Sequence, residues 1–142
     1  MSDLKLIGMD QEDLEVIASH VQDALLYVQD IDFVVGKKQL NLAINRCHNE
    51  ANAGGNRAQR GHAGLVFSHV EHMQVQNINR AQPVQILSLL SIEFIPTEAP
   101  AGSIELIFAN NASIKLKVNC LEVHLADMGE TWTSHVKPSH KL

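Results

Sequence analysis

The chain has 142 residues, of which 45% are hydrophobic and 19% charged, and its formal net charge is −5. This length fits one domain with a full hydrophobic core, and the composition argues against disorder. The negative charge disfavours a nucleic-acid binder or an anionic-membrane binder, because such proteins present a concentrated basic face. The sequence shows neither a signal peptide nor an apolar run long enough to span a bilayer. We expect a cytoplasmic protein with a globular domain over residues 1–136 and a polar tail over residues 137–142.

Most of the chain carries the patterns of β-strands. Short segments with alternating or β-branched apolar residues are separated by turn-forming residues, as in an antiparallel protein. The predicted strands cover residues 4–9, 25–28, 31–35, 39–45, 63–75, 84–95, 104–108 and 114–118. The segment 63–75 changes the parity of its apolar residues midway, which predicts a bulge or a bend. Segments 31–35 and 39–45 are predicted to form a hairpin.

Two helices are predicted, one near each end of the chain. Asp10 is placed to cap a helix over residues 11–23, whose apolar residues recur three and four positions apart. Asn119 is placed to cap a second helix that ends at Met128, with Glu122 as its capping-box partner. The predicted fold class is therefore α+β, a bent antiparallel sheet or open barrel with an N-terminal and a C-terminal helix. A pleckstrin-homology-like barrel is the nearest named architecture, by analogy only.

The last hairpin allows a prediction of register. Apolar residues of segments 104–108 and 114–118 share one face only if the connecting loop has an odd length, and we predict Asn110, Asn111 and Ala112 as its three residues. This register places Glu105 opposite Lys117. In the strand before it, Val84 to Phe94, the even-numbered apolar residues are predicted to face the core. The predicted core consists of Leu14, Ile17, Val21, Leu42, Ile44, Leu65, Phe67, Ile86, Leu90, Ile92, Leu106, Phe108, Ile114, Leu116, Leu121 and Leu125.

A long polar segment from His48 to Gly61 contains three glycines and no apolar periodicity, which predicts a mobile loop. Arg46, Arg57 and Arg60 lie in or beside it. Arginine suits the recognition of phosphate and carboxylate groups, so these three residues are the predicted ligand-binding positions. A solvated connecting loop is the alternative interpretation.

A metal site is the second hypothesis. On the predicted C-terminal helix Cys120, His124 and Asp127 fall four and three positions apart, so one helix face would present three ligands. Cys47 and Cys120 are far apart in the chain and are interpreted as reduced thiols in an intracellular protein. The sequence contains no His-x-x-x-His or Cys-x-x-Cys pair, and no cofactor is predicted.

Several stretches together identify a family. They are Leu4–Ile7, Asp10–Leu14, His20–Ala24, Asn45–Arg46, Leu87–Ile92, Ala99–Gly102 and Cys120–Gly129. In these stretches the chain resembles a family of small alphaproteobacterial proteins known only as a domain of unknown function, family 2948. Relatives carry a more basic and aromatic segment where this chain reads Cys47-His48-Asn49, which weakens a shared nucleic-acid or anion site there. The resemblance implies no activity, cofactor or catalytic residue.

The sequence thus predicts an uncharacterised protein that acts as a non-enzymatic binding or scaffold module. Its predicted partner is a protein or an acidic small molecule, with no nucleic acid and no membrane, and its oligomeric state is left open. The alternative is a metal-dependent protein or small enzyme that uses Cys120, His124 and Asp127.

Overall fold

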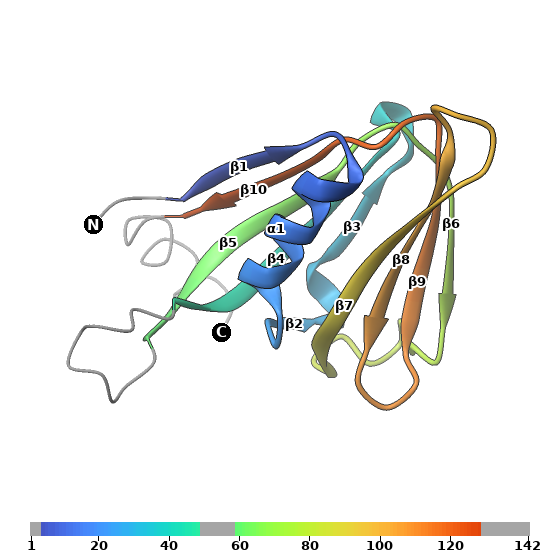
Figure 1. Ribbon diagram of the computed structural model, residues 1–142. Coiled ribbons are helices and arrows are strands. Elements are labelled where there is room, and N and C mark those ends of the chain that lie inside the picture. Colours follow the sequence, from blue (N-terminus) through green and yellow to red (C-terminus); the bar gives the residue numbers. More distant parts are fainter. Residues whose placement is uncertain (1–3, 49–58, 129–142) are drawn as a thin grey trace.

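The computed structural model describes residues 4–48 and 59–128, which form one α-helix and ten β-strands (Figure 1). The helix, α1, spans Gln11–Val21. The strands are β1 (Lys5–Gly8), β2 (Leu25–Tyr27), β3 (Ile31–Val34), β4 (Gln39–His48), β5 (Gln59–Phe67), β6 (Val70–Gln76), β7 (Ile86–Pro96), β8 (Gly102–Phe108), β9 (Ser113–Val118) and β10 (Val123–Asp127). Single 3-10 turns, Val28–Asp30 and Val35–Lys37, lie on either side of β3.

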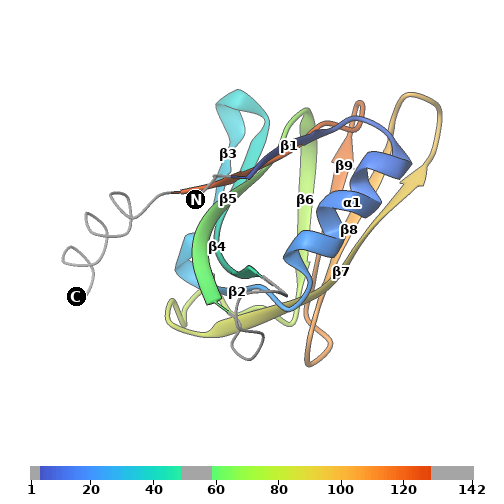
Figure 2. The same ribbon diagram turned by 60° about the vertical axis from the view of Figure 1, so that its left-hand side comes forward.

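The strands form one open antiparallel sheet. Its order is β1-β10-β5-β4-β2-β7-β8-β9-β6, with β3 paired to β4 beside this path. Strand β2 is the corner, since it pairs with β4 on one side and with β7 on the other. The sheet bends there, so that β1, β10, β5 and β4 lie on one side of the molecule and β7, β8, β9 and β6 on the other (Figure 1). In the view of Figure 2, β4 and β5 are set apart from β7, β8 and β9. The path ends at β1 and β6, which leaves the sheet open and not closed into a barrel.

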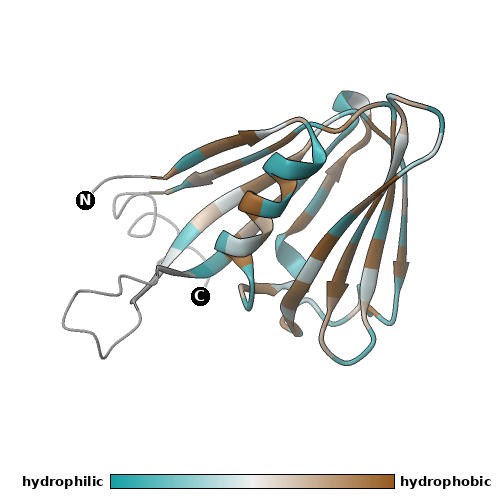
Figure 3. Cartoon of the chain, viewed as in Figure 1, coloured by the Kyte–Doolittle hydropathy of each residue, from teal (hydrophilic) through white to brown (hydrophobic). Residues whose placement is uncertain are grey.

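The core lies inside this bend. Alternate residues of each strand face inward, as the period of two in a pleated strand requires, and hydrophobic and polar residues alternate along the strands accordingly (Figure 3). Helix α1 packs against β1, β4 and β7 through Leu14, Ile17 and Val21. The Asp10 side chain accepts a hydrogen bond of 2.8 Å from the Asp13 backbone N–H, which confirms the predicted N-cap.

Much of the predicted arrangement is confirmed. The helix, the strand interruption near residues 28–30 and the hairpin of β3 with β4 are present. The expected bend between residues 63 and 75 separates β5 from β6, and His69 takes a positive φ of 59° there. Every residue of the predicted core is buried except Ile86 and Leu90.

The predicted C-terminal helix over residues 119–128 is wrong. Residues 123–127 form β10, which pairs with β1 on one edge and β5 on the other. The residues expected to cap the helix make other hydrogen bonds. The Asn119 side-chain amide donates to the Glu71 carboxylate, and the Glu122 carboxylate is hydrogen-bonded to the rings of His69 and His124. Pairing on both edges satisfies the backbone groups of β10, and this outweighs a weak local helix preference. Without that helix, the pleckstrin-homology-like analogy is not confirmed.

Two registers also differ from the prediction. The β8–β9 loop is odd, as expected, and Asn110 and Asn111 have positive φ, but Phe108 closes it by donating to the Ala112 carbonyl. Glu105 therefore faces Lys115 and not Lys117. In β7 a shift of register between Leu89 and Ser91 changes the parity, so that Leu87 and Leu89 face the core while Ile86 and Leu90 face outward.

The expected mobile loop over residues 48–61 is partly strand. Residues 46–48 of β4 pair with residues 59–61 of β5, and the remaining positions, 49–58, lie outside the described residues. The predicted polar tail, 137–142, lies outside them as well. Within the two described ranges, no helix has the length and apolar character needed to cross a membrane.

Candidate ligand-binding groove

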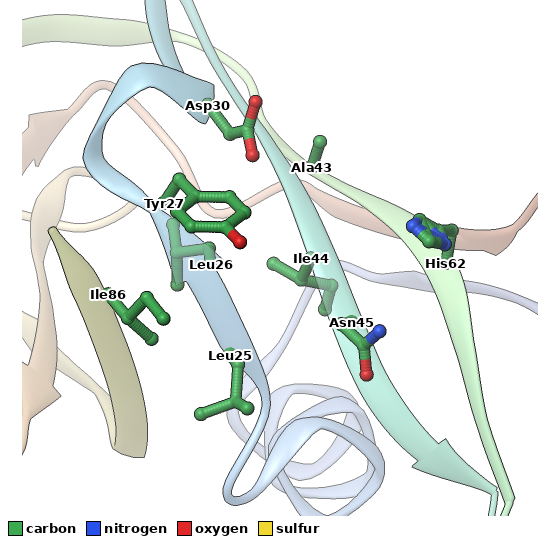
Figure 4. Close-up of a pocket in the computed structure, with 9 residues that line it drawn as sticks. All are labelled: Leu25, Leu26, Tyr27, Asp30, Ala43, Ile44, Asn45, His62 and Ile86. Atoms are coloured by element: carbon green, nitrogen blue, oxygen red, sulfur yellow. The ribbon is translucent and has the colours of Figure 1, made fainter. Parts of the chain in front are cut away.

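A groove of about 340 Å³ lies at the corner of the sheet, between β2 and β4 (Figure 4). It exists because these two strands are paired over a very short length. Leu25 pairs with Asn45, after which the chain leaves β4 through the 3-10 turn, and β3 resumes the pairing at Leu42. The stretch of β4 between these two pairings lines the opening. The β2–β4 groove is lined by Leu25, Leu26, Tyr27, Asp30, Ala43, Ile44, Asn45, His62 and Ile86.

The floor and rim of the groove are apolar. Leu26 and Ile44 are buried members of the core that reach the groove from below. Above them, Leu25, Tyr27 and Ile86 keep 36%, 43% and 57% of their surface exposed. Scattered exposed apolar residues are normal, but three that gather around one hollow form the kind of patch that binds another molecule.

Polar groups stand along the β4 and β5 side of the groove. Asn45 and His62 are cross-strand neighbours, and Asp30 projects from the 3-10 turn (Figure 4). Burial lowers the pKa of His62, and the negative charge of Asp30 opposes that effect without overcoming it. His62 is therefore neutral at pH 7, because its ordinary value is 6.5. Asp30 is the only Asp or Glu side chain among the described residues that line the groove.

Arg46, the first of the predicted ligand-binding residues, is engaged inside the protein. Its Nε and Nη2 donate to the two carboxylate oxygens of Asp127 at 2.8 and 3.0 Å, and its Nη1 donates to the His20 carbonyl at 3.4 Å. The two paired side chains are only 7% and 5% exposed. They meet across β5 where its inward positions are Gly61 and Ala63, which leave room for them. The pair joins β4 to β10.

Arg57 lies outside the described residues. Arg60 belongs to β5 and pairs with Cys47 of β4, but its side chain is not among the described ones. A ligand-binding role for these two arginines stays a prediction.

The proposed metal ligands do not share a face. His124 and Asp127 lie on a strand and, being three residues apart, point to opposite faces. Asp127 faces inward to Arg46, whereas His124 faces outward and its Nε2 lies 2.8 Å from Glu122. Cys120 is a half-buried free thiol in the connection before β10. Among the described residues, no group of three or more His, Cys, Asp or Glu side chains is arranged to hold a metal ion.

Sequence reasoning missed the groove residues Tyr27, Asp30, His62 and Ile86. One signal was available, since the interruption of the strand pattern near Asp30 marks the point where β2 ends and the groove opens. The exposure of Ile86 had no local signal, because it depends on the register shift farther along β7.

Comparison with known proteins adds a family and no activity. A family model described as a protein of unknown function (DUF2948) matches residues 4–140, a range that includes all the described residues. Comparisons with curated proteins and with solved structures gave no match.

Proposed function

Because the chain belongs to the DUF2948 family of proteins of unknown function, we propose its role from its geometry: it is a binding module whose β2–β4 groove receives an apolar side chain of a partner protein. The observation that carries this proposal is the opening at the corner of the sheet, where exposed apolar residues surround access to the core. Pockets that bind ligands combine such apolar walls with a few placed polar groups.

Charge indicates which residue type in the partner should lie next to its apolar side chain. The Asp30 carboxyl group lies in the lining, and the whole chain carries a net charge of −5. A partner segment that places Lys or Arg next to an aliphatic or aromatic residue is complementary to both features.

Selection from a random peptide library displayed on phage tests the proposal, because it requires no candidate partner. The enriched peptides should share an apolar residue beside a basic one. Their affinity, measured by isothermal titration calorimetry, should fall about four- to twentyfold in Ile86→Ser. Fully covering an isoleucine side chain contributes about 1.5–3 kcal/mol, and Ile86 is 57% exposed, so about half of that is gained on binding.

Ile95→Ser is the matched control. Ile95 is 49% exposed, close to the 57% of Ile86, and lies at the other end of β7. Peptides whose affinity is unchanged by Ile86→Ser, or is lowered equally by Ile95→Ser, would refute the groove as the binding site. In Asp30→Asn, the salt dependence of peptide binding should weaken.

A further inference from the structure

A second hollow lies on the opposite half of the sheet and differs in chemistry. It occupies about 230 Å³ over the outer face of β6, β9 and β8 and the loop after β7. We call it the lysine hollow, and its polar lining consists of His72, Gln74, Thr97, Ser103, Lys115, Lys117 and Asn119. The β2–β4 groove shares none of these residues.

The register of the strands explains why these side chains gather. Lys117 lies between Ser103 of β8 and His72 of β6, and all three are directly paired across the strands. Directly opposite residues in an antiparallel sheet point to the same face, with their Cβ atoms about 5 Å apart. Lys115 stands two residues before Lys117 in β9 and so projects from that same face.

Both lysines lack an ion-pair partner among the described residues. The nearby Glu71 carboxylate attracts Lys117, but it accepts its hydrogen bonds from Lys38 at 2.9 Å and from the Asn119 amide. Glu105 is the cross-strand neighbour of Lys115, but no ion pair within 4.0 Å joins them. In a chain with a net charge of −5, two unpaired lysines beside a hollow form a local exception.

We infer that the lysine hollow binds a small dianion, either a phosphate group or a dicarboxylate. Lys115 and Lys117 supply the positive charge, and Ser103, Thr97 and His72 supply hydrogen-bonding groups around it. The volume sets the size of the ligand, because hollows that enclose drug-sized molecules measure about 300–1,000 Å³. A molecule with a few carbon atoms fits, whereas a nucleotide exceeds it.

Chemical-shift titration of the isotope-labelled full chain tests this inference. Orthophosphate and succinate serve as separate probes, each added at constant ionic strength against sodium chloride, because added salt alone screens charges over about 10 Å. Saturable shifts confined to β9 and the facing residues of β6 and β8 are expected with at least one probe. Saturation by orthophosphate alone identifies a phosphate ligand, and saturation by succinate alone identifies a dicarboxylate.

Variants separate a site from general charge screening. Lys115→Gln and Lys117→Gln should each weaken binding about two- to fivefold, the range expected for exposed charge pairs. Lys5→Gln, at an exposed lysine on β1, is the matched control and should leave the affinity unchanged. Glu105→Gln removes the acid opposite Lys115 and should strengthen binding.

Shifts that never saturate with either probe, or that spread over the surface, would overturn the inference. Equal effects of Lys5→Gln and Lys117→Gln would overturn it too. Neither result bears on the β2–β4 groove, which peptide binding tests independently.

Discussion

The buried pair of Arg46 and Asp127 should be the most sensitive polar position in the chain. In Arg46→Met, Asp127 loses both charged hydrogen bonds and stays only 5% exposed, while the Leu4 backbone N–H still donates to it at 3.2 Å. Removing one partner of a buried ion pair costs about 3–5 kcal/mol, because the desolvated charge that remains loses its attraction to the other. This is a large part of the about 5–15 kcal/mol that stabilises a typical domain.

Urea denaturation followed by circular dichroism measures this loss. With a slope near 2 kcal/mol per molar urea, the midpoint of Arg46→Met should fall by about 2 M. The double variant Arg46→Met/Asp127→Leu should recover much of that loss, since an apolar pair of similar volume restores packing without a buried charge.

The exposed pair of Lys38 and Glu71 is the control for this experiment. Its side chains are 57% and 35% exposed, although its N–O distance of 2.9 Å matches the buried pair. Lys38→Met should therefore cost less than about 1 kcal/mol. A midpoint for Arg46→Met within error of that for Lys38→Met would show that solvent reaches Asp127, and the argument from burial would fail.

Two further predictions concern the core and the surface. Phe108→Ala should lower the free energy of unfolding by about 3–5 kcal/mol, because Phe108 is fully buried. Ile86→Ala should change it by less than about 1 kcal/mol. Equal losses in urea denaturation would contradict the outward position of Ile86. Hydrogen bonds from His124 and His69 lower the pKa of Glu122 below its ordinary value of 4.5, so the stability that Glu122 contributes is present above that value and is lost as the pH falls through the lowered pKa. The urea midpoint should thus fall less steeply on acidification in Glu122→Gln than in the unaltered protein. The difference should be small, because the carboxylate is largely solvated. Parallel pH profiles of the two proteins would exclude the two hydrogen bonds.

The elements with local signals could be predicted from the sequence. Helix α1 has a capping aspartate and an apolar stripe, and the β3–β4 hairpin has alternation on both strands. The segment Val123–Asp127 fits either a helix or a strand when taken alone. Its place between β1 and β5 decides the outcome. These strands are more than a hundred and about sixty residues away in the chain, and no local pattern carries that information.

The surroundings of Arg46 and of the groove residue Ile86 are harder to predict for the same reason. Arg46 borders a polar segment, which suggests an exposed ligand, yet its even position in β4 puts it on the inward face with Leu42 and Ile44. That parity can be read from the sequence. Its partner cannot, because Asp127 meets Arg46 only when β10 and β4 flank β5. The parity of Ile86 depends on a register shift that the sequence does not mark.

The β2–β4 groove follows from the topology of the sheet and not from faulty packing. Strand β2 pairs with β4 through Leu25 alone but with β7 through Leu25, Leu26 and Tyr27, so it follows β7 and leaves β4 at this corner. The chain therefore has to open at this corner, and the rim residues there add little to the core because they remain exposed. Residues in such a position can change without unfolding the protein. For that reason a substitution of Ile86 should weaken peptide binding strongly while it changes the urea midpoint only slightly.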